Sequence, residues 1–238
     1  MSQKNVDHKE FLDKDVVIHY QMGFDLKDFK SRIAYITAEI EKVRPDFDHE
    51  FVENRLAFYI AHSYLDADKF DLAIPYFAKE HALRKETDPF YLFPIQMLIR
   101  CYGEIGDFEK GLHWFKMAII HFDQASGFDK LTTLKEYVHL ITKTGHHFDE
   151  QYIYLIEEIT EELGFHETTG NSIERILDLW KVNLKWNRRM CDIHLLKEKD
   201  IPIEIELWKN YIIECEVGWY RAYAKNYIAD LKKKNADI

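Results

Sequence analysis

The chain reads LAFYIAHSYLDADKFDLAIPYF from Leu56 to Phe77 and PIQMLIRCYGEIGDFEKGLHWF from Pro94 to Phe115. The two stretches share aromatic and small residues at matched positions: Tyr64 and Tyr102, Phe70 and Phe108, Ala73 and Gly111, Phe77 and Phe115. Apolar residues recur every three or four positions on both sides of a short polar break, which is the spacing of amphipathic helices. Each stretch therefore predicts two antiparallel helices that approach closely at the small residue, with rings filling the seam between them.

Helical spacing continues on both sides of this repeat. Helices are expected at about 26–44, after Asp48, from Phe70, from near Pro89, from Phe108, and at about 129–143 and 149–163. Asp25 is the expected N-cap of the first helix, and Gly106-Asp107 and Gly145 are the expected breaks between later ones. The 238 residues include 9 glycines and 5 prolines. This shortage of turn-forming residues favours long helices and argues against an all-β fold.

The second stretch resembles the tetratricopeptide repeat, a helix–turn–helix unit of about 34 residues. The matching residues are Tyr102, Gly106, Asp107, Phe108, Gly111, Phe115 and Ala118. The resemblance implies an all-α fold, a right-handed α-solenoid of antiparallel helix pairs, with about three units over 26–168. The spacing from Tyr64 to Tyr102 is 38 residues, four more than the repeat length of about 34. Four residues make about one helical turn, so we expect the second helix of the first unit to extend by one turn through Ala82-Leu83. The third unit matches less well, because His146-His147 intervene before Phe148.

The C-terminal third predicts two longer helices. Apolar stripes run over 172–197 and 203–235, and four of the five tryptophans lie there. We expect a long helical hairpin over 169–238 that caps the repeats, with 1–25 as an N-terminal extension. An alternative is that this hairpin forms a homodimer or docks a partner, because aromatic residues are enriched at interface hot spots.

The resemblance also predicts a binding face. In that family the first helix of each pair lines a concave surface that binds peptides. The corresponding residues here are Arg55, Phe58, His62, Phe93, Gln96, Arg100, Thr132, Lys135 and His139. Cations beside aromatic rings suit an acidic or C-terminal peptide segment, through charge-assisted hydrogen bonds and apolar anchoring. They do not reproduce the lysine/asparagine pattern of the chaperone-tail carboxylate clamp, so that ligand is not implied. The alternative without a binding role is that these side chains are solvated on the surface or pack internally.

The leading functional hypothesis is a non-enzymatic scaffold or adaptor that binds a protein or peptide partner. Residues 101–170 suggest an alternative, because they carry 5 basic and 13 acidic side chains. Such an acidic surface could belong to an inhibitor or immunity-type protein that neutralises a basic partner. The net charge of −10 argues against binding to nucleic acid or to an acidic membrane surface.

No catalytic motif emerges from the sequence. It contains no P-loop, GxGxxG, GxSxG or HExxH pattern, so neither an enzyme nor a cofactor or metal is expected. A helical metalloenzyme is a third hypothesis, since Glu157, Glu158, Glu161 and Glu162 form two i,i+4 pairs, although they lack a Glu-x-x-His partner. The three cysteines form no CxxC pair, and no apolar run is long enough to span a membrane, so a cytoplasmic location is expected.

Overall fold

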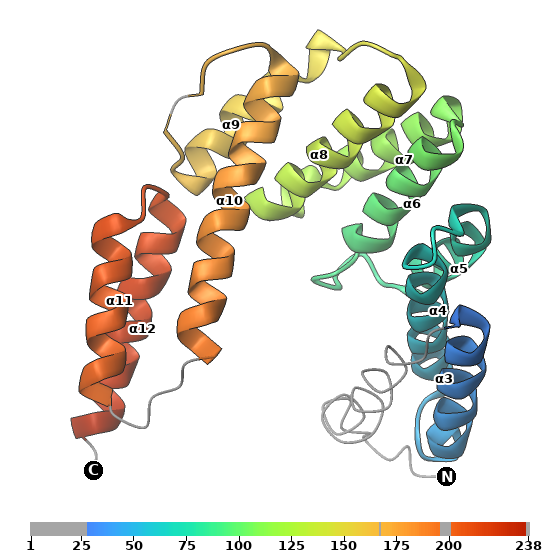
Figure 1. The fold of residues 1–238 in the computed structure, drawn as a ribbon, viewed down its shortest axis with the longest axis horizontal. Coiled ribbons are helices and arrows are strands. Elements are labelled where there is room, and N and C mark those ends of the chain that lie inside the picture. The colour runs from blue at the N-terminus through green and yellow to red at the C-terminus, as the bar shows by residue number, and fades with distance from the viewer. Residues whose placement is uncertain (1–27, 167, 196–200, 237–238) are drawn as a thin grey trace. The chain divides into compact units, whose positions relative to one another are not determined.

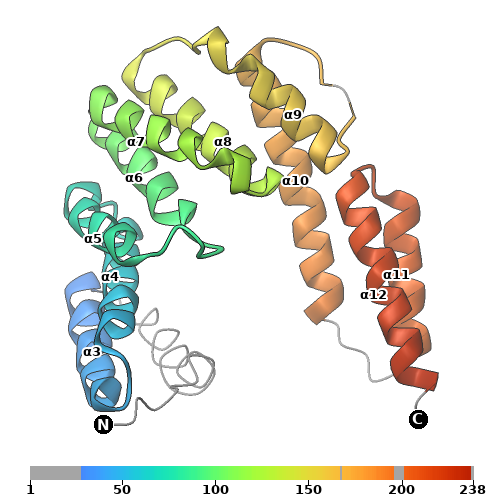
Figure 2. The same cartoon turned by 180° about the vertical axis from the view of Figure 1, so that it is seen from behind.

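The computed structural model describes residues 28–166, 168–195 and 201–236, which fold into helices joined by short connections, with no strand among the described residues (Figures 1 and 2). The helices are α3 (Phe29–Val43), α4 (His49–Leu65), α5 (Phe70–Leu83), α6 (Leu92–Ile105), α7 (Phe108–Ile120), α8 (Gly127–Thr144), α9 (Ile153–Leu163), α10 (Ser172–Leu195), α11 (Ile201–Glu214) and α12 (Gly218–Ala236). Three short 3₁₀ turns, η1 (Arg44–Asp46), η2 (Phe122–Gln124) and η3 (Glu150–Tyr152), lie between them. The predicted all-α class is confirmed for the described residues. The predicted extension 1–25 and the predicted N-cap Asp25 lie outside them.

The chain forms two compact units. The first contains the described residues up to His121 together with 139–146, and the second contains 122–138 and the described residues from His147 onward. The division falls within α8, so the units do not coincide with the segments 26–168 and 169–238 that the sequence pattern suggests. None of the described helices combines the length and apolar character needed to cross a membrane.

In the first unit, the helices from α3 to α7 each pack against the next one along the chain (Figure 1). The seam residues of the repeat are buried as expected: Ala73, Phe77, Gly111 and Phe115. One apolar cluster joins Ala61, Ala73 and Phe77 to Leu98 and Cys101 of α6. These contacts hold α4 and α6, the two helices that carry most of the predicted face, within the same core.

The turns of the first unit repeat the same backbone geometry at a spacing of 38 residues. Asp68 has φ of +54° and Gly106 has φ of +78°, both in the left-handed region. The next amide N–H donates to the matched tyrosine carbonyl in both turns, Lys69 to Tyr64 and Asp107 to Tyr102, each at 2.9 Å. Both following helices then begin at the matched phenylalanines, Phe70 and Phe108. The matched stretches in the sequence therefore share their turn conformation as well as their apolar pattern.

One length expectation for the repeat holds only in part, because α5 does run through Ala82 and Leu83. α5 has 14 residues and α7 has 13, so α5 is not a full turn longer than its counterpart. The helix stops because Arg84 has extended backbone angles, φ −89° and ψ 144°. The additional residues lie instead in the connection 84–91 between α5 and α6, where they help form the cavity described below.

The second unit corrects the predicted hairpin. The helix expected over 203–235 is two helices, α11 and α12, separated by non-helical residues 215–217. The Gly218 N–H donates to the Gly164 carbonyl at 2.8 Å, and a Cβ on Gly218 would lie 3.2 Å from the Gly164 Cα. The break therefore brings the start of α12 against the end of α9, a close approach that glycine at both positions permits.

The tryptophans of the C-terminal third have mixed environments. Trp186 and Trp208 are buried in a cluster with Tyr211 and Tyr220, whereas Trp219 is 39 % exposed. The Tyr211 hydroxyl donates to the Trp186 carbonyl at 3.0 Å. Trp186 and Trp208 thus belong to the core of the second unit. The homodimer predicted through this region stays a prediction.

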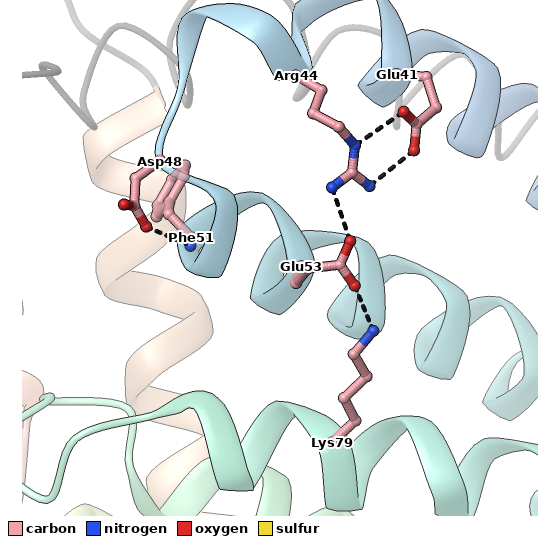
Figure 3. A network of polar contacts seen from close by, with 6 residues as sticks. All are labelled: Glu41, Arg44, Asp48, Phe51, Glu53 and Lys79. Atoms are coloured by element: carbon pink, nitrogen blue, oxygen red, sulfur yellow. Dashed lines mark hydrogen bonds and ion pairs between the residues drawn. The ribbon is translucent and has the colours of Figure 1, made fainter.

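A network of charged side chains fixes the start of α4 (Figure 3). Glu53 accepts hydrogen bonds from Arg44 at 2.7 Å and from Lys79 of α5, and Arg44 also binds Glu41. Lys79 and Arg44 lower the pKa of Glu53 below its usual value. Asp48 caps α4 by accepting from the Phe51 N–H at 3.1 Å, and the helix starts after Asp48, as the sequence predicts. The network therefore holds α4 in place between α3 and α5, with Glu53 about half a turn from Arg55 on the same helix.

Candidate functional site

Three of the predicted binding residues form an aromatic cluster in the first unit. Phe58 and His62 lie on α4, and Phe93 lies on α6. The ring centroids are 4.4 Å apart for Phe58 and His62, 5.5 Å for His62 and Phe93, and 6.0 Å for Phe58 and Phe93. The imidazole of His62 stacks on the Phe93 ring with an interplanar angle of 15°. The structure thus brings together residues that are 35 positions apart in the sequence.

Arg55 extends this cluster toward the start of α4. Its guanidinium carbon lies 4.9 Å from the Phe58 ring centroid and 5.0 Å from that of Tyr59, within cation–π range. One guanidinium nitrogen, Nη2, donates to the Tyr59 hydroxyl at 3.0 Å. The Nε is buried and has no hydrogen-bond partner among the described residues. We refer to Arg55, Phe58, His62 and Phe93 together as the α4–α6 face.

The histidine of this face is held in its neutral form. Burial lowers the pKa of His62 from 6.5 to about 4, and the nearby Asp66 only partly opposes this shift. Its Nε2 is buried without a hydrogen-bond partner among the described residues. At neutral pH the face therefore presents aromatic surface and one cation, Arg55.

A cavity of about 550 Å³ adjoins Arg55. It lies between the start of α4 and the connection from α5 to α6. Its lining includes Phe51, Asn54, Arg55, Leu83, Lys85 and Phe90. Phe90 is 66 % exposed. Sequence reasoning missed this cavity. The signal that could have pointed to it is the repeat spacing of 38 residues, which leaves a long connection after α5.

A buried ion pair forms part of the cavity wall, because Arg84 lines the cavity together with Asp88. Glu80 is fully buried, and its Oε1 accepts from Arg84 Nε at 3.1 Å and from Nη2 at 2.6 Å. Arg84 Nη1 donates to Asp88 at 3.1 Å, so all three guanidinium nitrogens of Arg84 are in use. Burial raises the pKa of Glu80, although the hydrogen bonds from Arg84 oppose this. Arg84 is therefore committed to the fold, whereas Arg55 retains donors.

The other predicted residues lie in different surroundings. Gln96 is buried in the core, and Arg100 is partly buried with its Nε lacking a partner among the described residues. His139 Nε2 lies 3.0 Å from Glu104. In the second unit, Thr132 donates to the Phe128 carbonyl at 2.8 Å. Lys135 pairs with Glu136 at 2.8 Å and lies over the Trp180 ring. Thr132 and Lys135 therefore belong to the second unit, and Thr132, Lys135 and His139 each have a partner within the protein.

The acidic helix α9 is partly neutralised within the second unit. Glu158 and Glu162 both bind the buried Lys130. Glu157 and Glu161 instead line a second cavity, also of about 550 Å³, together with Arg175. Within the residues that the structure describes, no group of three or more His, Cys, Asp or Glu side chains could hold a metal ion.

In comparisons with known proteins, no family model, curated protein or solved structure matches this chain.

Proposed function

We propose that this protein is a non-enzymatic adaptor that binds a peptide segment of a partner protein on the α4–α6 face. In this proposal the helix pairs belong to a right-handed solenoid of tetratricopeptide-like units. The observation that carries it is the position of Arg55, whose guanidinium lies over Phe58 and keeps a buried Nε without a partner among the described residues. A desolvated arginine with unused donors beside aromatic surface favours an anionic, partly apolar ligand.

The two chemical parts of the face support different contacts with a peptide. A carboxylate can accept charge-assisted hydrogen bonds from Arg55, and an apolar side chain can lie against Phe58 and Phe93. His62 contributes its ring without a competing charge, since burial lowers its pKa to about 4. The combination therefore suits peptides that place an apolar residue next to an acidic group.

A display selection tests this proposal. A library of random peptides is selected on the full-length protein, and enriched peptides are then measured against the Phe58→Ala/Phe93→Ala double variant. The matched control is Tyr154→Ala, which removes an aromatic ring that is 52 % exposed on α9. We expect the double variant to weaken binding at least tenfold while the control leaves it unchanged, with circular dichroism confirming that both are folded. Equal binding by the double variant, or no enriched peptide, would contradict the proposal.

The acidic surface of α9 supports a second candidate function, neutralisation of a basic partner. Glu157 and Glu161 are exposed and line a cavity, so they are available to cations. Peptides rich in lysine and arginine should then bind with an affinity that falls steeply with salt, and Glu157→Gln/Glu161→Gln should abolish that binding. Salt-independent binding of such peptides would remove this candidate.

A further inference from the structure

Some of the charged side chains around the cavity beside Arg55 already have partners within the protein, and others do not. Asp88 binds Arg84 and accepts from the Phe90 N–H at 2.8 Å. Asp48 is used as the N-cap of α4. The cavity residues with no ion pair among the described residues are Arg55 and Lys85, which are cationic, and Asp48 and Glu50, which are acidic. Among these four groups only Arg55 is half-buried, whereas Lys85, Asp48 and Glu50 are exposed, so Arg55 is the cation held within the cavity wall.

The remaining surfaces of the cavity define what accompanies the negative charge. Phe51, Leu83, Pro89 and Phe90 supply apolar wall. Asn54 donates its Nδ2 to the Glu80 carbonyl at 3.1 Å, which leaves its Oδ1 as an acceptor. A volume of about 550 Å³ is within the usual range for small-molecule sites. One half-buried arginine beside apolar walls matches a monoanion on an apolar body better than a phosphate, whose larger charge favours several cations.

We propose that this cavity binds a carboxylate attached to an apolar group, with Arg55 as the carboxylate receptor and Phe51, Leu83 and Phe90 as the wall for the apolar group. Such a ligand can be a free organic acid or the end of a peptide chain. The inference shares the Arg55 guanidinium with the proposed function but goes beyond it, because a small acid can occupy the cavity when no peptide lies on the α4–α6 face. Arg84 is not part of the receptor, since Glu80 and Asp88 already engage its guanidinium.

The experiment titrates the full-length, isotope-labelled protein with 3-phenylpropionate and follows amide chemical shifts. The neutral 3-phenylpropanamide is the matched ligand, and inorganic phosphate is the alternative anion. We expect millimolar binding of the acid with shifts at residues 50–55 and 83–90, and at least tenfold weaker binding of the amide and of phosphate. A second arm uses N-acetyl-Gly-Gly-Phe with a free carboxylate, and tighter binding than that of 3-phenylpropionate identifies a chain terminus as the preferred source.

Variants separate this inference from the proposed function. Arg55→Gln should weaken binding of the acid about tenfold or more. Arg188→Gln removes an exposed arginine of α10 and should change nothing. Phe93→Ala alters the α4–α6 face but not the cavity, so it should reduce peptide binding while the small acid still binds. The proposal is overturned if the acid and the amide bind wild-type protein equally, if Arg55→Gln binds the acid normally, or if no shifts occur around the cavity.

Discussion

Exchanging the residues at the two matched turns provides a sharp test of the repeat. Asp68 and Gly106 both have positive φ, +54° and +78°. A Cβ placed on Gly106 meets no atom within 4 Å. The Asp68 side chain is exposed and makes no hydrogen bond with the described residues. Substitutions at these positions therefore change the backbone preference and little else.

The expected magnitude follows from the cost of left-handed backbone. In the left-handed region, an L-residue other than Asn or Asp costs about 1–2 kcal/mol of stability, and Asp costs less. Glycine gives back part of the difference through the larger entropy of its unfolded state. We therefore expect Gly106→Ala to lower the free energy of unfolding by about 1 kcal/mol and Asp68→Gly to raise it by less, up to about 0.5 kcal/mol.

The assay is urea denaturation of the full-length variants, followed by circular dichroism. A change of about 1 kcal/mol corresponds to roughly 2–4 °C in a parallel thermal scan of a chain of this size. The double variant should lie near the sum of the single changes, since the sites share no contact partner. A destabilising Asp68→Gly, or a neutral Gly106→Ala, would refute the reasoning that both turns require the same backbone conformation.

Three further outcomes are expected. Glu53→Gln removes the ion pairs of Glu53 with Arg44 and Lys79 that Figure 3 draws, and should lower the free energy of unfolding by about 1 kcal/mol in urea denaturation; no loss would mean that the network does not stabilise α4. His62 has a pKa of about 4 in the fold against 6.5 unfolded, so between these values only the unfolded chain takes the proton. Stability should therefore fall by up to about 3 kcal/mol as pH drops from 6.5 toward 4, and His62→Phe should flatten this slope; an unchanged slope would show that His62 is not the group responsible. Gly218→Ala should cost about 1–3 kcal/mol by thermal denaturation, since its Cβ would press on Gly164, and a stabilised variant would contradict that close approach.

The turns of the first unit were accessible to sequence reasoning because their chemistry is local. Gly106 supplies the left-handed residue that ends α6, and Asp107 caps α7 by accepting from the Lys110 N–H. The break before Gly218 was not accessible in the same way. It depends on a close approach to Gly164, 54 positions earlier, and the stretch itself reads as a continuous helical pattern.

The candidate site was accessible only in part. Helical spacing is enough to place Phe58 and His62 on one side of α4, and the aligned repeat places Phe93 beside them. Whether an arginine of the cavity can bind a ligand depends on whether its guanidinium already has partners within the fold. Arg84 is consumed by Glu80 and Asp88, whereas Arg55 is not, and a sequence does not reveal how such competing partners are divided.

Photo-crosslinking tests the central claim about the binding face most directly. A photoreactive phenylalanine replaces Phe93 of α6 in one protein and Tyr154 of α9 in another, and each is irradiated with the same selected peptide. We predict that the peptide is attached to position 93 and that an excess of unlabelled peptide suppresses this. Attachment at position 154 without attachment at position 93 would contradict the claim that α4 and α6 form the site.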